Sequence, residues 1–310
     1  MQVETTRLAR FRPRELTPVW FTRLAVATSV ALYAIIVTGA TVRLTSSGLG
    51  CESWPGCEAG AFFPARDAHA FVEFGNRVFG VVPITLTLLA WLGARRTPSL
   101  SRWVVRLALA TFVGTLAQAP LGRLTITFDL HPLLVMSHFL LALLVLAGAV
   151  VVALEARSHE IGRAPAIVPR EVQRAGIVLV AACLTLVVTG TLSTAAGPHA
   201  GGADIRRLGV LTDMLYVHVR ATALFGCVFL FVLGYLAAGR RRSPRLFAVT
   251  LALLGLVLLQ MAVGEVQWRT ELPWLVVLLH VAMATAIWTA TVVLAALFWR
   301  PPASFAAART

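Results

Sequence analysis

A pattern of glutamine, glycine and histidine occurs twice in this sequence with identical spacing. The first copy consists of Gln118, Gly122 and His138. Each of the three is followed 142 positions later by the same amino acid, at Gln260, Gly264 and His280. The same step leads from Asn76 to His218, so each half of the chain has two marked positions. Because internal duplication at a constant spacing indicates two copies of one structural unit, we expect two similar halves.

Long apolar segments recur along the whole chain. Of its 310 residues, 58% are hydrophobic and 13% are charged, whereas about a quarter of the residues of a soluble domain are charged. Runs of about 20 apolar residues have the length of a membrane-spanning helix. They predict eight helices, over residues 20–44, 70–94, 103–122, 131–154, 174–196, 212–237, 246–266 and 272–299. The expected fold is an all-α integral membrane protein with eight transmembrane helices, arranged as two pseudo-symmetric four-helix bundles.

The two halves correspond to residues 1–154 and 174–310, with a polar linker over residues 155–173. The formal net charge is +13, but the arginines stand in short segments between apolar runs, where basic residues mark the cytoplasmic side. This placement argues against nucleic-acid binding. It predicts a multi-pass protein of the plasma membrane with both termini cytoplasmic. The polar segment 1–14 lacks the pattern of a cleavable signal peptide.

The marked positions share one depth in this arrangement. The second, fourth, sixth and eighth helices begin at the outer face, and they carry Asn76, His138, His218 and His280. Each position lies about two turns inside its helix, on the order of 10 Å below the outer surface. Four such positions at one level suit a flat ligand held between pairs of helices.

His218 and His280 are the strongest candidates for a cofactor site. An ionisable residue within a span is costly and usually has a partner or a function. Histidines on facing helices commonly hold cofactors in helix bundles, and two imidazoles fill both axial positions of an iron porphyrin. The alternative is that the two histidines are unrelated and each forms hydrogen bonds across helices. Zinc is disfavoured because the sequence offers no third and fourth ligand at this depth.

The first half carries an incomplete copy of this pair, since Asn76 is a poor axial ligand. One strong ligand, His138, leaves a coordination position of the iron open for chemistry, whereas a closed pair suits electron transfer. The alternative is that this half has lost its site. Glu73 shares a helix face with Asn76 and is a candidate proton donor or acceptor. A structural salt bridge between Glu73 and Arg77 is the competing interpretation.

Arginines and cysteines stand near the outer ends of the spans. Arginine binds carboxylates bidentately, so Arg77, Arg123 and Arg220 are candidates for pairing with porphyrin propionates. Interfacial placement without a ligand is the alternative. Cys51 and Cys57 stand in the first outer loop, which faces an oxidising compartment where paired cysteines form disulfides. We expect a Cys51–Cys57 disulfide with a structural role, a redox-active role, or both.

A series of short motifs follows the chain from its first span to its last. The motifs are Thr38-Gly39, Val42-Arg43-Leu44-Thr45, Gly48-Leu49-Gly50-Cys51 with Cys57, Glu73-x-x-Asn76-Arg77, Gln118-x3-Gly122 with His138, Gly197-Pro198-His199-Ala200-Gly201, His218, and Gln260-x3-Gly264 with His280. Each is weak alone, but the combination is specific. Together they resemble the haem A synthase family over nearly the whole chain.

This resemblance implies an enzyme, a membrane haem-dependent oxidoreductase. It would oxidise a ring methyl group of haem o to a formyl group and so supply haem a for terminal oxidase assembly. The resemblance implies haem b in the C-terminal half, with His218 and His280 as iron ligands. It implies the substrate haem o in the N-terminal half, where the Glu73 and His138 positions are kept. Family members commonly have histidine at the position of Asn76, so this chain is a variant.

The partners expected on this resemblance are haem o, membrane lipid, an unidentified electron donor, haem o synthase and the machinery of terminal oxidase assembly. The main alternative function is a di-haem membrane electron-transfer protein without substrate oxidation, which would want histidine in place of Asn76. Haem o synthase activity would need aspartate-rich loops for magnesium diphosphate, and the aspartates here are scattered singly. A transporter built from repeats would contain no haem.

Overall fold

The computed structural model describes residues 15–64, 67–199, 201, 205–241 and 243–305. In that part of the chain, eight helical segments are long and apolar enough to cross a membrane. The same part contains two isolated β-bridges and no named strand. The prediction of an all-α membrane protein with eight spans is therefore confirmed. The basic segment 1–14 lies outside the described residues.

The N-terminal half consists of α1 (Pro18–Leu44), α2 (Ala68–Phe79), α3 (Val81–Arg96), α4 (Arg102–Thr127) and α5 (Pro132–Ile161). α2 and α3 together form the second span, which the sequence predicted as one continuous helix. The break falls at Gly80, three residues before Pro83. Because Pro83 has no backbone N–H, it cannot bond to the carbonyl of Phe79, and the helical hydrogen-bond series is interrupted there.

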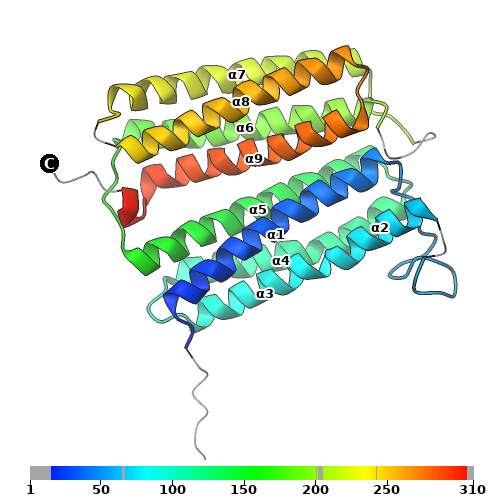
Figure 1. Cartoon of the computed structure of the whole chain (residues 1–310), viewed down its shortest axis with the longest axis horizontal. Helices are drawn as coiled ribbons and strands as arrows, with labels where there is room; N and C mark the ends of the chain where they lie inside the picture. Colours follow the sequence, from blue (N-terminus) through cyan, green and yellow to red (C-terminus); the bar gives the residue numbers. More distant parts are fainter. Residues whose placement is uncertain (1–14, 65–66, 200, 202–204, 242, 306–310) are drawn as a thin grey trace, which may run out of the picture.

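The C-terminal half consists of α6 (Arg170–Ala196), α7 (Leu211–Ala238), α8 (Pro244–Arg269) and α9 (Trp274–Trp299), followed by the short 3-10 helix η1 (Ala303–Phe305). Figure 1 shows α6 to α9 as one group of helices and α1 to α5 as a second group beside it. α1 and α5 pack against α9. The start of α1 and the end of α9 lie at the same end of the molecule (Figure 1), as an even number of spans requires.

The two groups share a continuous hydrophobic core. Buried side chains from α1, α5, α6, α7, α8 and α9 form one cluster. Hydrogen bonds also cross between the groups: the Tyr33 hydroxyl donates to the Ala282 carbonyl and the Trp288 indole N–H donates to the Leu143 carbonyl, both at 2.9 Å. A buried indole N–H without a partner costs about 1–3 kcal/mol. These bonds therefore favour one relative position of the two halves.

Helix α5 is longer than the sequence predicted and reaches Ile161 instead of residue 154. The connection to α6 is consequently confined to residues 162–169. Glu155, expected in the linker, is buried within α5 and forms ion pairs with Arg163 and Arg300. Burying a charge is costly unless it is paired, and these two arginines come from the connection and from the end of α9. Pairing over a distance in sequence therefore lets the helix continue through a charged residue.

Candidate functional site

The four marked residues lie at one level of the helix bundle. Asn76, His138, His218 and His280 stand in α2, α5, α7 and α9. All four helices begin at the end of the molecule that carries the Cys51–Cys57 loop, here called the disulfide end (Figure 1). Each marked residue comes about two turns after the start of its helix, roughly 10 Å along the axis. This agrees with the common depth expected from the sequence.

In the C-terminal half, each histidine is supported by a polar side chain and a glycine of a neighbouring helix. Oγ1 of Thr189 lies 3.2 Å from Nδ1 of His218, and a Cβ atom on the adjacent Gly190 would lie 3.0 Å from Cε1 of that ring. Nε2 of Gln260 donates to the carbonyl of His280 at 3.1 Å. A Cβ atom on Gly264 would lie 3.3 Å from Cε1 of His280. Both imidazoles therefore pack directly against backbone that carries no side chain.

The same contacts occur in the N-terminal half. The Thr38 hydroxyl donates to Oδ1 of Asn76 at 2.8 Å. Gln118 Nε2 donates to the carbonyl of His138 at 3.3 Å, and a Cβ atom on Gly122 would lie 3.4 Å from Cε1 of His138. A Cβ atom on Gly39, which follows Thr38, would lie 3.9 Å from Nδ2 of Asn76, so Gly39 corresponds to Gly190 in the other half. The surroundings of Asn76 therefore match those of His218, although the two side chains differ.

The threonine–glycine dipeptide is also duplicated, which the constant step of 142 residues does not reveal. Thr38-Gly39 in α1 and Thr189-Gly190 in α6 perform the same contact, but they are 151 positions apart instead of 142. The loop between the first and second spans is longer in the N-terminal half, so a search at a single step cannot match them. A comparison of the first helix of each half, made without that step, would have found the shared dipeptide.

The nitrogen atoms of the histidines suit iron that already has equatorial ligands. Thr189 occupies Nδ1 of His218, which leaves Nε2 of that ring for a ligand. The described residues contain no group of three or more His, Cys, Asp or Glu side chains that could hold a metal ion. Two imidazoles without further protein ligands fit a porphyrin better than they fit zinc, which needs three or four.

Each half also contains buried polar atoms that lack a hydrogen-bond partner. They are Nδ1 of His138 and His280 and Oε1 of Gln118 and Gln260. Such atoms cost free energy in a closed interior. They occur at corresponding glutamine and histidine positions of the two halves, so the halves share this feature as well. In the C-terminal half, α8 packs closely on α9 but only sparsely on α7.

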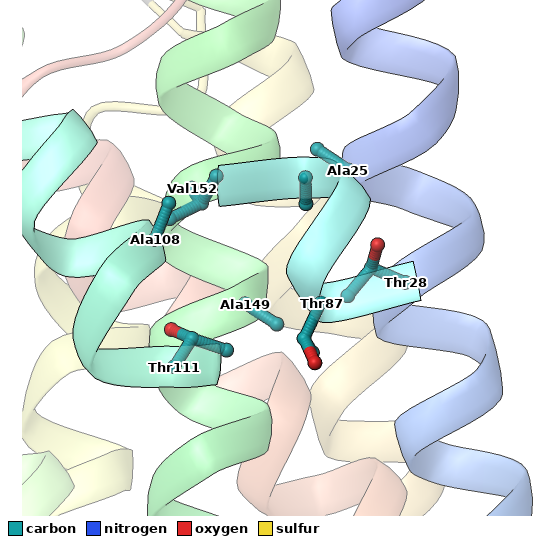
Figure 2. A pocket seen from close by; sticks show the side chains of 8 residues that line it. Ala25, Thr28, Thr87, Ala108, Thr111, Ala149 and Val152 are labelled. Carbon is teal, nitrogen blue, oxygen red and sulfur yellow. The ribbon is translucent and has the colours of Figure 1, made fainter. Parts of the chain in front are cut away.

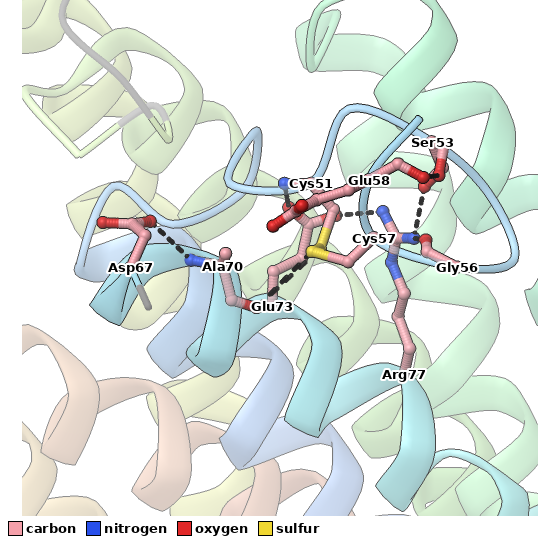
Figure 3. The surroundings of a disulfide bond; sticks show 9 residues. All are labelled: Cys51, Ser53, Gly56, Cys57, Glu58, Asp67, Ala70, Glu73 and Arg77. Atoms are coloured by element: carbon pink, nitrogen blue, oxygen red, sulfur yellow. Dashed lines mark hydrogen bonds and ion pairs between the residues drawn. A yellow bond between two sulfur atoms is a disulfide. The ribbon is translucent and has the colours of Figure 1, made fainter. Parts of the chain in front are cut away.

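Cys51 and Cys57 form a disulfide, which confirms that prediction. Figure 3 shows the bond above α2, with Glu73 and Arg77 beneath the loop. Glu73 is 4% exposed, and its Oε2 accepts a hydrogen bond from the Cys51 N–H at 2.9 Å. Its Oε1 pairs with Arg77 at 2.5 Å. The ion pair considered as the structural interpretation of Glu73 is therefore present.

Arg77 also binds the disulfide loop. Its Nη1 donates to the carbonyl of Ser53 at 2.7 Å and to that of Gly56 at 2.6 Å (Figure 3). The other two candidate arginines are exposed: Arg220 stacks on Tyr216, and Arg123 lies 5.6 Å from the centre of the Trp54 ring. All three make contacts of their own within the described part of the chain.

A small pocket of the N-terminal half lies elsewhere (Figure 2). It is lined by residues of α1, α3, α4 and α5: Ala25, Thr28, Thr87, Ala90, Ala108, Thr111, Ala149 and Val152. The hydroxyls of its three threonines donate to backbone carbonyls. The lining therefore offers small apolar groups and hydroxyls that are already bonded. None of the marked residues belongs to it, so we do not take it as the functional site.

Comparison with known proteins gives a consistent picture. A family model described as cytochrome oxidase assembly protein matches residues 22–70 and 65–292. A relative named heme A synthase from Bacillus pumilus is 32% identical over 133 residues, covering 42% of this chain and 43% of the relative. Its namesake from Symbiobacterium thermophilum is 34% identical over 132 residues, covering 42% of each chain.

A third relative with the same name, from Shewanella oneidensis, is 32% identical over 138 residues, covering 39% of this chain and 40% of the relative. The chain thus spans less than half the length of these relatives in the aligned regions. The family model, by contrast, extends over most of the chain and includes all four marked positions. On that match, the chain belongs to the cytochrome oxidase assembly protein family.

Proposed function

We propose that this protein is a haem A synthase of the plasma membrane, with both termini cytoplasmic. It would oxidise the ring methyl group of haem o to a formyl group and yield haem a for terminal oxidase assembly. The single observation that carries the proposal is the duplicated set of contacts around the marked residues, which hold His218 and His280 in one half and Asn76 and His138 in the other. The printed names of the relatives support the same activity.

In this proposal the C-terminal half, residues 174–310, holds haem b for electron transfer. His218 and His280 would bind the haem iron. The contact between Thr189 and Nδ1 of His218 would leave Nε2 of that ring free for the iron, a function that such outer hydrogen bonds commonly have at metal sites. Gly190 and Gly264 allow the rings to lie against the helix backbones. Bound haem supplies one-electron redox chemistry.

The N-terminal half, residues 1–154, would bind the substrate haem o. His138 is the one strong ligand available there, and its carbonyl is held by Gln118. The amide of Asn76 is oriented by Thr38, and a weak ligand in that position keeps one face of the substrate accessible. The substitution of asparagine for histidine is thus assigned a function in this chain.

Glu73 is the proposed proton donor or acceptor for the oxidation. It stands one helical turn before Asn76, so both side chains share a face of α2. Its carboxylate accepts a hydrogen bond from the Cys51 N–H and pairs with Arg77, so both oxygens already have partners that a proton-transfer step would have to rearrange. We further propose that Arg77 and Arg220 pair with haem propionates after exchanging their present partners. An unidentified electron donor, haem o synthase and the terminal oxidase assembly machinery are the proposed partners.

Haem analysis of the purified protein tests the proposal. The full chain is produced in a host that makes haem o but cannot convert it, and the extracted haems are identified by pyridine haemochrome spectra and chromatography. The expected result is haem b bound to the protein together with newly formed haem a. Bound haem b with unchanged haem o would favour the di-haem electron-transfer alternative. Protein without any haem would overturn both functions.

A further inference from the structure

Arg43 is a cation inside the helix bundle for which the described residues provide no counter-charge. It stands in the last turn of α1, at the disulfide end. One terminal nitrogen, Nη2, donates to the carbonyl of Thr194 in α6 at 3.3 Å. Its Nε is shielded from solvent and has no partner. None of the ion pairs among the described residues includes Arg43.

An unpaired guanidinium in this position needs an explanation. A buried charge is expensive unless it is paired and hydrogen-bonded, and arginine cannot discard its proton at ordinary pH. One hydrogen bond to a neutral carbonyl leaves most of its five donors unused. A planar donor group with free N–H bonds is suited to bind the two oxygens of a carboxylate or phosphate.

Two hydrogen bonds relate Arg43 to the surroundings of His218 in the C-terminal half. The Thr194 hydroxyl donates to the carbonyl of Gly190 at 3.0 Å, so these two residues lie one turn apart on α6. Gly190 is the residue that packs against the ring of His218. The guanidinium of Arg43 thus reaches from the N-terminal half to a point one turn beyond the iron-binding level of the C-terminal half. This is the side toward the disulfide end.

We propose that Arg43 binds the propionate carboxylates of the porphyrin held by His218 and His280. The inference rests on the proposed haem b site and adds a residue of the other half to it. A porphyrin carries both carboxylates at one edge, so a cation beyond one edge of the pocket also sets the direction in which the ring enters. The C-terminal site is therefore incomplete without α1.

Two other anions could bind a guanidinium in the same way as a propionate. One is the phosphate of an anionic lipid, and the other is the carboxylate of Asp204, which lies outside the described residues. The experiment must separate these sources from a porphyrin. Arg43→Gln removes the charge and Arg43→Lys retains it. Arg269→Gln is the matched control, because Arg269 is an exposed arginine near the disulfide end that pairs with Glu265 at the surface of α8.

The first measurement is the rate at which the purified full-length holoprotein loses protohaem to excess apomyoglobin. Charge-assisted hydrogen bonds are strong enough that Arg43→Gln should lose haem about 10- to 100-fold faster than wild type. Arg43→Lys should lie between the two, and Arg269→Gln should match wild type. Equal rates for wild type and Arg43→Gln, or for Arg43→Gln and Arg43→Lys, would overturn the proposal.

The second measurement starts with wild-type protein, so its first comparison does not depend on the folding of a variant. Protein from a haem-deficient host is titrated with protohaem and with protohaem dimethyl ester, in which both carboxylates are neutral. We expect the ester to bind more weakly to wild type and the penalty to shrink in Arg43→Gln. Equal affinity of wild type for both porphyrins contradicts the assignment.

Two further results identify the other anions. Loss of tightly bound lipid phosphate from Arg43→Gln at unchanged haem retention would assign Arg43 to a lipid headgroup and overturn the porphyrin assignment. Asp204→Asn could also cause the same increase in haem loss as Arg43→Gln. If wild type then binds both porphyrins equally well, Arg43 pairs with Asp204 and not with the porphyrin. If wild type holds no haem at all, the proposed function fails first, and the haem analysis described above detects that separately.

Discussion

Gly190 offers a way to disturb the C-terminal site without removing a ligand. A Cβ atom at this position would lie 3.0 Å from Cε1 and 3.4 Å from Nδ1 of His218. Favourable contact between carbon atoms is at about 3.5–4.0 Å, so the methyl group of Gly190→Ala must displace the imidazole by several tenths of an ångström. The same displacement weakens the contact between Thr189 and His218, which already measures 3.2 Å.

Two effects of opposite sign follow from this substitution. Alanine is favoured over glycine in a helix interior by about 0.8–1.0 kcal/mol. Without haem, the ring of His218 can rotate away from the methyl group, so the haem-free protein should keep its stability. With haem, the ring is fixed by the iron, and overpacking of this kind costs about 1–3 kcal/mol. We therefore expect roughly 5- to 150-fold weaker protohaem binding.

Haem transfer to apomyoglobin and thermal unfolding of the haem-free protein measure the two effects separately. Gly226→Ala is the matched control, since it adds a methyl group to α7, the helix of His218, at a point where nothing lies within 4 Å. Faster haem loss is expected from Gly190→Ala alone. The same rate of haem loss in wild type and Gly190→Ala would refute the argument that the backbone at this glycine supports the iron-binding ring.

Three other predictions concern the ligands, the carboxylate and the disulfide. His280→Ala should abolish the low-spin spectrum of protohaem, and a preserved bis-histidine spectrum would exclude it as a ligand. Glu73→Gln should lower haem a formation about 10²- to 10⁴-fold with protohaem retained, measured by chromatography of extracted haems; loss of protohaem instead would indicate a structural role. Cys51 and Cys57 should resist alkylation in unreduced protein, and the double serine variant should unfold about 2 kcal/mol more easily; mass mapping that finds both thiols free would contradict this.

The spans could be predicted from the sequence because bilayer thickness fixes the length of an apolar helix. The break at Gly80 was not predicted, because the apolar run continues through it and was read as one helix. Its position depends on the missing N–H of Pro83. The extension of α5 beyond residue 154 was not predicted because a charged residue follows the apolar run. Glu155 is charged and therefore resembles a linker residue, and the sequence alone does not show that Arg163 and Arg300 fold back to pair with it.

The candidate histidines could be found in the sequence, whereas the residues that support them could not. Histidines in apolar spans are conspicuous, and a constant step of 142 residues connects them. The groups that support them are ordinary residues of helices, and only their spatial neighbours give them meaning. Thr189 is one of many threonines that bond back to their own helix, and it also contacts His218. Arg43 resembles an ordinary residue at the end of a span, and only the structure shows that the described residues give it no counter-charge.

The disulfide loop and Glu73 are parts of one arrangement, so the structural and functional interpretations of each need not compete. The carboxylate of Glu73 is held by the Cys51 N–H, and its partner Arg77 is held by the carbonyls of Ser53 and Gly56. All three contacts come from the loop that the disulfide closes. Any change in that loop must therefore alter the position of the carboxylate or the strength of its ion pair. Because Asn76 lies one helical turn farther along the same face of α2, the loop can influence the surroundings of Asn76 through Glu73.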